Sequence, residues 1–134
     1  MQDIVILSAA RTAVGDFGGA LKDLSPTDLG VETARAAIAR AGIEAPEVQQ
    51  AFYGNVIHTE PRDMYLSRTI ALGAGLAETA PALPVNRLCG SGLQAVISGI
   101  QALALGDAEI VMAGGAESMS RAGYMLPAAR WGQK

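Results

Sequence analysis

The chain has 134 residues, which is enough for one domain with a hydrophobic core but too few for two. Half of the residues are hydrophobic, 17% are charged and the mean hydropathy is +0.26, a balance that excludes an intrinsically disordered chain. The net charge of −3 at pH 7 argues against a surface that binds nucleic acids.

The first predicted strand and helix lie before residue 42. Residues 4–7 form a short apolar run rich in β-branched side chains, which predicts a strand buried on both faces. After a glycine-rich connection, a helix is predicted to begin with Ser25 as its cap, Pro26 in its first position and Asp28 three residues after the cap. Apolar residues then recur every three or four positions up to Gly42, a suitable helix end.

Strand and helix patterns alternate along the rest of the chain. The predicted strands are residues 51–57, 83–86 and 109–113, and the predicted helices are residues 62–75 and 93–105. Strands separated by helices need crossover connections, so we expect an α/β fold with a largely parallel sheet. Aromatic residues make up only 4% of the chain, against 25 alanines and 16 glycines, so we expect close packing through small side chains.

The third predicted helix, residues 93–105, is apolar on every side. Such a helix is buried all round, and because one sheet covers only one side, the pattern implies a second layer from another subunit or from further sequence. The uncharged stretch of residues 88–106 approaches the length of a membrane span. It holds serines, glutamines and four glycines and lacks an aromatic or basic belt, so we expect a soluble chain and no membrane span.

Cys89, in the stretch PVNRLCGSGLQAV, is the only residue with strong potential as a nucleophile. It lies between a strand that ends near Asn86 and a helix that begins near Ser91, where the helix dipole and unpaired N–H groups favour a thiolate. Gly90 and Gly92 leave room for an acyl group and for backbone N–H groups that face an oxyanion. This layout is that of a nucleophile elbow with sulfur in place of oxygen. A small buried core cysteine is the alternative interpretation.

Other polar residues favour structural roles. His58 lies in a connecting segment, where surface or interface packing is a better interpretation than a base that activates Cys89. Glu117, Ser118 and Ser120 could form a polar network near the site, although such clusters after a strand more often form turns and caps. Four arginines could meet a phosphate, but a solvated or salt-bridged role is the better interpretation for them: Arg11, Arg62, Arg68 and Arg87.

The numbers of cysteines and histidines limit which cellular compartment and which cofactors the chain can have. With one residue of each type, the chain excludes an internal disulfide and the usual zinc sites. A lone thiol indicates a reducing, cytoplasmic setting, and the first residues lack the basic region of a signal peptide. The glycines of residues 15–19 match neither a dinucleotide-binding nor a nucleotide-triphosphate-binding loop, so no such cofactor is expected.

Four stretches, in this order along the chain, carry a specific resemblance: ILSAARTAVGDFGGALKDL, GNVIHTEPRDMYLSR, NRLCGSGLQA and AGGAESMSRAGYMLPAARW. Together they resemble the thiolases, the family of acetyl-CoA acetyltransferases and β-ketothiolases, with NRLCGSGLQA as the nucleophile motif. The second stretch is most similar to the broad-range bacterial β-ketothiolases. Ala13, Ala116 and Gly123 depart from the family's usual proline, methionine and proline, all outside the nucleophile motif.

The resemblance implies a thiolase-like half-domain, with a mixed, mostly parallel sheet, helices on both faces and a buried third helix. Residues 1–134 correspond to about the first third of a family-length chain and end where the loop domain for coenzyme A begins. Cys89 would be acylated on sulfur, its backbone N–H would help to hold the oxyanion, and Gly90 and Gly92 would lie beside the substrate. The family's catalytic histidine and second cysteine come from later sequence, so these roles have no candidate here.

Three functions remain open at this point. The first is an acyltransferase that condenses two acyl-CoA molecules to a 3-ketoacyl-CoA or cleaves it with coenzyme A, as a homodimer or homotetramer and without a metal or redox cofactor. The second is a non-catalytic assembly half of a thiolase-fold protein, because the proton-handling residues are missing. The third is a ketoacyl-synthase relative that loads from a carrier protein, which NRLCGSGLQA argues against.

Overall fold

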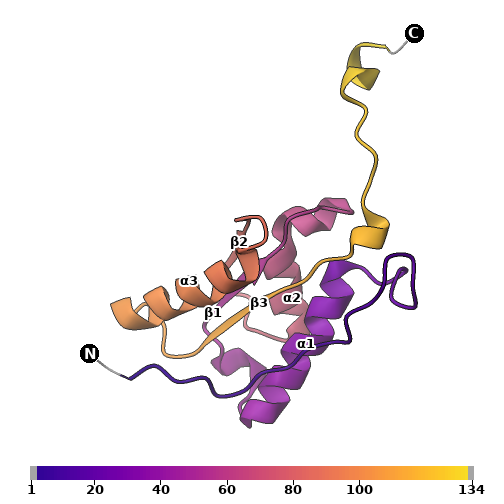
Figure 1. Ribbon diagram of the computed structural model, residues 1–134. Coiled ribbons are helices and arrows are strands. Elements are labelled where there is room, and N and C mark those ends of the chain that lie inside the picture. The colour runs from indigo at the N-terminus through magenta and orange to yellow at the C-terminus, as the bar shows by residue number, and fades with distance from the viewer. Residues whose placement is uncertain (1–2, 133–134) are drawn as a thin grey trace.

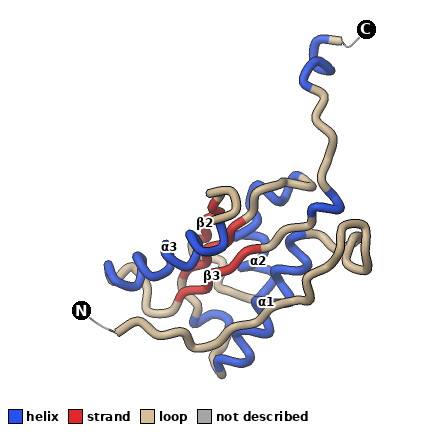
Figure 2. The backbone as a smooth tube through the Cα atoms, in the orientation of Figure 1, coloured by secondary structure: helices blue, strands red, loops and turns tan. Residues whose placement is uncertain are grey.

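A three-stranded sheet forms the centre of the computed structural model, which describes residues 3–132; the ends of the predicted domain 1–134 lie outside the described residues. Its strands are β1 (Gln50–Gly54), β2 (Ala82–Val85) and β3 (Val111–Gly115). The spatial order is β2-β1-β3, and both outer strands run parallel to β1 (Figure 2). The described sheet is therefore entirely parallel, which agrees with the predicted crossovers.

Helices cover both faces of the sheet, as the alternating pattern predicts (Figure 1). They are α1 (Pro26–Ala41), α2 (Leu66–Ala74) and α3 (Ser91–Leu105). On one face α1 and α2 form a core with the sheet, in which Tyr53 lies with Leu66 and Ile70. On the other face Phe52 packs with Ala95 of α3. Because neighbouring side chains of a strand point to opposite faces, β1 supplies both cores.

α1 begins and ends where the sequence predicts. The Ser25 hydroxyl accepts the Asp28 N–H at 3.1 Å, and the Asp28 carboxylate accepts the Ser25 N–H at 3.2 Å, which makes a reciprocal capping box. Pro26 occupies the first helical position, where a missing N–H costs no hydrogen bond. Gly42 ends the helix in the left-handed conformation, with φ 69°.

The other predicted elements are present with shifted boundaries. The predicted helix at residues 62–75 is divided into a 3-10 turn, Pro61–Tyr65, followed by α2. The turn forms because the Asp63 carboxylate folds back to accept the N–H groups of Thr59 and Glu60. The predicted second, third and fourth strands correspond to β1, β2 and β3, with ends that differ by up to three residues.

The strand predicted at residues 4–7 is wrong for the described structure. The segment is extended but pairs with no described strand, and Ile6 is 85% exposed where burial on both faces was expected. The residues that follow it contact α1 instead: the Ser8 hydroxyl donates to the Ala37 carbonyl at 2.7 Å, and Arg40 donates to the Ala9 carbonyl at 2.8 Å. A strand forms only by pairing with the free edge of another strand. Residues 4–7 do not pair with β3; both segments line an open cavity of about 1880 Å³.

α3 is buried on one face only, which corrects the prediction of a helix buried all round. Ala95, Gly99 and Ala102 face the sheet, while the large apolar side chains on the rest of the helix are exposed: Leu93, Val96, Ile100 and Leu105. The sheet covers one side, and no element within residues 3–132 covers the other, so the expected second layer is not supplied by this part of the chain. The segment Leu88–Leu105 is long and apolar enough to cross a membrane, a property that core helices of soluble proteins share.

Beyond the 3-10 turn Met119–Arg121, which follows β3, the chain leaves the body of the molecule. Residues 122–132 extend away from it and contain one 3-10 turn, Pro127–Trp131 (Figure 1). Tyr124, Met125 and Trp131 are exposed along this extension. The loop-like C-terminal sequence thus adds nothing to the described core.

Candidate active site

Cys89 lies in the turn that joins β2 to α3, where the sequence predicts it. β2 ends at Val85, and α3 begins at Ser91 with Gly90 as its N-cap. The turn is at the carboxyl ends of parallel strands, the edge at which open α/β sheets bind their ligands. Its thiol is exposed, which excludes the alternative of a buried core cysteine in the described structure.

The residue before Cys89 has an unusual backbone conformation. Leu88 has φ 50° and is the only residue other than glycine with a positive φ in the described range. Its N–H donates to Asn86 Oδ1 at 3.1 Å, and its carbonyl accepts the Ser91 hydroxyl at 2.6 Å. Strained residues of this kind cluster at active sites. No sequence pattern predicts it, because leucine disfavours the left-handed region.

In the described part of the chain, backbone N–H groups without a hydrogen bond lie at Cys89 and at the start of α3. Among residues 3–132, the N–H groups of Cys89, Gly92 and Leu93 form no hydrogen bond. The first N–H groups of a helix are unpaired within the helix and attract negative charge, so an oxyanion formed beside Cys89 would meet donors here. A Cβ built on Gly92 meets no atom within 4 Å, so the space beside the start of α3 is open.

The end of β1 supports the turn from within the sheet. A Cβ on Gly54 would lie 2.6 Å from the Ser91 carbonyl carbon and 2.8 Å from the Gly92 nitrogen. A side chain of any size therefore displaces the start of α3, and only glycine allows this approach. Glycine at the end of β1 thus lets the sheet pack directly against the turn that carries Cys89.

Glu117 connects the end of β3 to this region. Its carboxylate accepts the N–H of Val56 at 3.0 Å and the N–H of Ile57 at 2.9 Å. The Val56 carbonyl in turn accepts Asn86 Nδ2 at 3.4 Å, on the loop that carries the thiol. Of the predicted polar network, Glu117 is therefore linked to the turn through the backbone, and it does not hydrogen-bond to Cys89 within the described residues.

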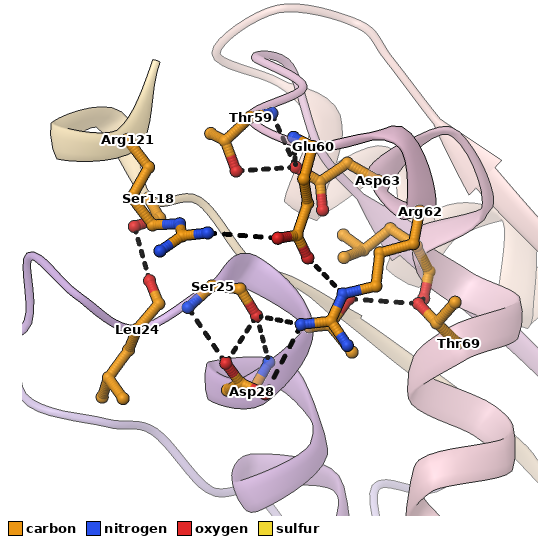
Figure 3. Close-up of polar contacts among 12 residues, drawn as sticks. Leu24, Ser25, Asp28, Thr59, Glu60, Arg62, Asp63, Thr69, Ser118 and Arg121 are labelled. Carbon is orange, nitrogen blue, oxygen red and sulfur yellow. Dashed lines mark hydrogen bonds and ion pairs between the residues drawn. The ribbon is translucent and has the colours of Figure 1, made fainter. Parts of the chain in front are cut away.

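A second network of polar side chains joins the start of α1 to the loops after β1 and β3 (Figure 3). Arg62 pairs with Glu60 and donates to the Ser25 hydroxyl at 3.0 Å, and Arg121 pairs with Glu60 at 3.1 Å. The Ser118 hydroxyl donates to a carbonyl of the loop before α1 at 2.7 Å. The Ser118 contact is that of a turn, and Arg62 forms a salt bridge, which were the favoured interpretations for these two residues.

Two groups in this network have shifted pKa values. Hydrogen bonds from Ser25 lower the pKa of Asp28, and the hydrogen bond to Glu60 raises the pKa of Arg62. Sequence reasoning missed Glu60 and Arg121 as partners; the dense charges of residues 60–63 were the only available signal. The network fixes loops beside the sheet and holds no residue that touches the thiol.

His58 is exposed, and no hydrogen bond joins it to Cys89 in the described structure. This position agrees with the surface interpretation and not with a base that activates the thiol. Residues 3–132 also contain no group of three or more His, Cys, Asp or Glu side chains that could hold a metal ion.

Comparison with known sequences gives a consistent result. The family model described as the N-terminal domain of thiolase matches residues 4–134. The chain is 54% identical over 133 residues to beta-ketothiolase BktB of Cupriavidus necator, which covers 99% of this chain and 34% of that protein. It is 48% identical over 131 residues to an acetyl-CoA acetyltransferase of Thiocystis violacea, which covers 98% of this chain and 33% of that protein.

Solved structures share the fold. Human mitochondrial 3-ketoacyl-CoA thiolase in complex with CoA has a TM-score of 0.92 and 40% identity, over 96% of this chain and 32% of that one. The acetyl-CoA acetyltransferase of Bacillus anthracis has a TM-score of 0.91 and 40% identity, over 97% of this chain and 33% of that one. The chain spans about a third of the length of the relatives it matches. With the predicted nucleophile motif and fold in place, the chain belongs to the thiolase family and corresponds to its N-terminal domain.

Proposed function

We propose that the protein containing this chain is a thiolase-type acetyl-CoA C-acyltransferase. It would condense two acyl-CoA molecules to a 3-ketoacyl-CoA or cleave that product with coenzyme A. The observation that carries the proposal is the exposed Cys89 directly before a helix whose first N–H groups lack acceptors within residues 3–132. The names of the relatives, a beta-ketothiolase and an acetyl-CoA acetyltransferase, support the same chemistry.

The chemistry begins with the Cys89 thiolate. It attacks the carbonyl carbon of an acyl-CoA, a new C–S bond forms, and the coenzyme A thiolate leaves and takes up a proton. In condensation, a second acyl-CoA loses a proton from its α-carbon, and that carbon attacks the thioester on Cys89. The new C–C bond releases the Cys89 thiolate and 3-ketoacyl-CoA, and thiolysis is the reverse sequence.

The start of α3 suits the tetrahedral intermediates of both steps. The Cys89 N–H is free to hold the oxyanion, and each such donor contributes on the order of 3 kcal/mol to the transition state. Gly92 leaves room for the acyl group, because a Cβ there meets no atom within 4 Å, whereas a Cβ on Gly90 would lie 3.4 Å from the Arg87 carbonyl oxygen. The proton carriers are assigned to residues outside this sequence, since its one histidine, His58, is exposed and does not hydrogen-bond to Cys89 in the described range.

Partners and setting follow from the same site. Acyl-CoA and coenzyme A are the proposed substrates, and 3-ketoacyl-CoA thiolase is a relative solved with CoA. The exposed apolar side of α3 supports a homodimer or homotetramer rather than a membrane-bound form, because its other side packs on a sheet. The net charge of −3 argues against a nucleic-acid partner. The single cysteine supports a cytoplasmic location. A thiolate and proton transfers suffice, so no metal or redox cofactor is proposed.

The unpaired side of α3 also favours a second candidate, a non-catalytic assembly half of a thiolase-fold protein. In that case the domain would contribute a contact surface for another chain and no catalytic residue. The two proposals differ in whether Cys89 becomes acylated.

Intact mass after incubation with acetyl-CoA tests the difference, with the protein that contains this chain and its Cys89→Ala variant. Catalysis predicts an acetyl-sized adduct on the native protein and none on Cys89→Ala. An adduct of equal size and rate on both proteins would assign the acyl group to another residue and refute the role of Cys89. A native protein without any adduct, although its thiol is alkylated rapidly, would favour the assembly half.

A further inference from the structure

We propose that Asn86 and Ser91 are positioning residues for Cys89. Together they hold Leu88 in its left-handed conformation and so set the direction of the thiol and of the Cys89 N–H. The inference rests on the proposed function for its catalytic meaning, but the geometry that it concerns is independent of the substrate.

The first step is the conformation of Leu88 itself. Its φ of 50° lies in the region where a side chain collides with the following carbonyl, so leucine disfavours it in a free chain. The side chain of Leu88 is largely exposed and gains little from burial. Packing of Leu88 therefore does not explain the conformation, and hydrogen bonds must hold it.

The second step is that hydrogen bonds hold the backbone on both sides of Leu88. Asn86 Oδ1 accepts the Leu88 N–H at 3.1 Å. The Ser91 hydroxyl donates to the Leu88 carbonyl at 2.6 Å and accepts the Arg87 N–H at 2.8 Å. Ser91 is only 4% exposed, so water does not easily replace these bonds.

The third step is that the side chain of Asn86 is also hydrogen-bonded toward the sheet. Asn86 Nδ2 donates to the Val56 carbonyl at 3.4 Å, and the Val56 N–H donates to Glu117 at 3.0 Å. Glu117 follows β3, and Val56 follows β1. The side chain of Asn86 therefore joins the strained residue before the thiol to the ends of β1 and β3.

The consequence is a defined role for each side chain. Without the Asn86 acceptor or the Ser91 hydroxyl, Leu88 relaxes toward negative φ, and the peptide between Leu88 and Cys89 turns. That rotation moves the Cys89 N–H away from the oxyanion and redirects the sulfur, while the core of the sheet keeps its packing. The expected loss is therefore in reactivity more than in stability.

The test compares Asn86→Ala, Asn86→Asp and Ser91→Ala in the protein that contains this chain. Two rates are measured on Cys89: alkylation by iodoacetamide over a range of pH, and acetylation by acetyl-CoA followed by mass. The rescue variant is Leu88→Gly in the Asn86→Ala background, because glycine adopts a positive φ without strain. Ser25→Ala is the matched control, since it removes a buried hydroxyl with similar hydrogen bonds at the distant start of α1.

Asn86→Ala and Ser91→Ala are expected to slow acetylation about tenfold, the range that the backbone strain implies. Asn86→Asp keeps an acceptor for the Leu88 N–H, so its acetylation rate should fall less than that of Asn86→Ala. Adding Leu88→Gly to Asn86→Ala should restore part of the lost acetylation rate. Ser25→Ala should lower the urea midpoint and leave both rates unchanged. Rates for Asn86→Ala that equal the native ones, or the absence of recovery with Leu88→Gly, would overturn the positioning role.

The two proposals fail in different ways. If the native protein is not acetylated but alkylation follows the expected order of variants, the positioning role stands and the proposed function fails. If the native protein is acetylated and all variants react alike, the function stands and the positioning role fails.

Discussion

Replacing Gly54 with alanine tests whether the end of β1 sets the place of the Cys89 turn. The added Cβ would lie 2.6 Å from the Ser91 carbonyl carbon and 2.8 Å from the Gly92 nitrogen. Atoms in contact need about 3.6 Å, so the start of α3 must move outward by about 1 Å. The neighbouring atoms belong to the backbone and have no rotamer to change, so overpacking of about 1–3 kcal/mol is expected.

Two measurements follow this displacement. The free energy of urea unfolding should fall by the stated amount, and acetylation of Cys89 should slow by up to roughly a hundredfold, because a shift of 1 Å in a reacting group has effects of that size. Gly123→Ala is the matched control, since a Cβ there meets no atom within 4 Å. If Gly54→Ala unfolds and reacts like Gly123→Ala, β1 does not set the position of the turn.

Two further predictions concern the fold. Ser25→Ala should lower the free energy of urea unfolding by about 1 kcal/mol through loss of the α1 cap. Hydrogen bonds from Ser25 also lower the pKa of Asp28, so Asp28 stabilises the fold above its ordinary pKa of 3.8 and loses this effect as the pH falls below it. That loss on acidification should be smaller in Ser25→Ala, and an equal loss in both proteins would contradict the prediction. Burial raises the pKa of Tyr53, so just above pH 10 this tyrosine ionises only in the unfolded state. The free energy of unfolding should therefore fall there by about 1.4 kcal/mol per pH unit, and Tyr53→Phe should reduce this slope. An equal slope in both proteins would refute the prediction.

Features set by neighbouring residues could be predicted from the sequence. The limits of α1 depend on Ser25, Asp28 and Gly42, all of which act within one turn of the helix. The place of Cys89 depends on a strand, two glycines and a helix that follow one another directly. In both cases the interacting groups are close in the chain, so the pattern and the structure carry the same information.

Features that need a distant partner could not be predicted. Residues 4–7 have the composition of a buried strand, but a strand also needs a free edge, and the composition does not say which element supplies it. The helix at residues 93–105 has an apolar surface all round, while the described sheet covers only the side of Ala95 and Gly99. Leu88 could not be predicted for a different reason: its partners Asn86 and Ser91 are near in the chain, but leucine's own propensity opposes the conformation that they hold.

The abundance of glycine gains a physical meaning at the end of the sheet. A Cβ on Gly54 would collide with the start of α3, and a Cβ on Gly115 would lie 3.1 Å from the Gly54 carbonyl and 3.7 Å from the Gly92 Cα. Three glycines from β1, β3 and α3 therefore meet backbone to backbone. This contact places the start of α3 against the sheet, and Cys89 lies two residues before that start. A larger residue at Gly54 or Gly115 would push the ends of the strands away from the N–H donors at the start of α3, so the small side chains that pack the core also hold the donors of the proposed acyl intermediate in place.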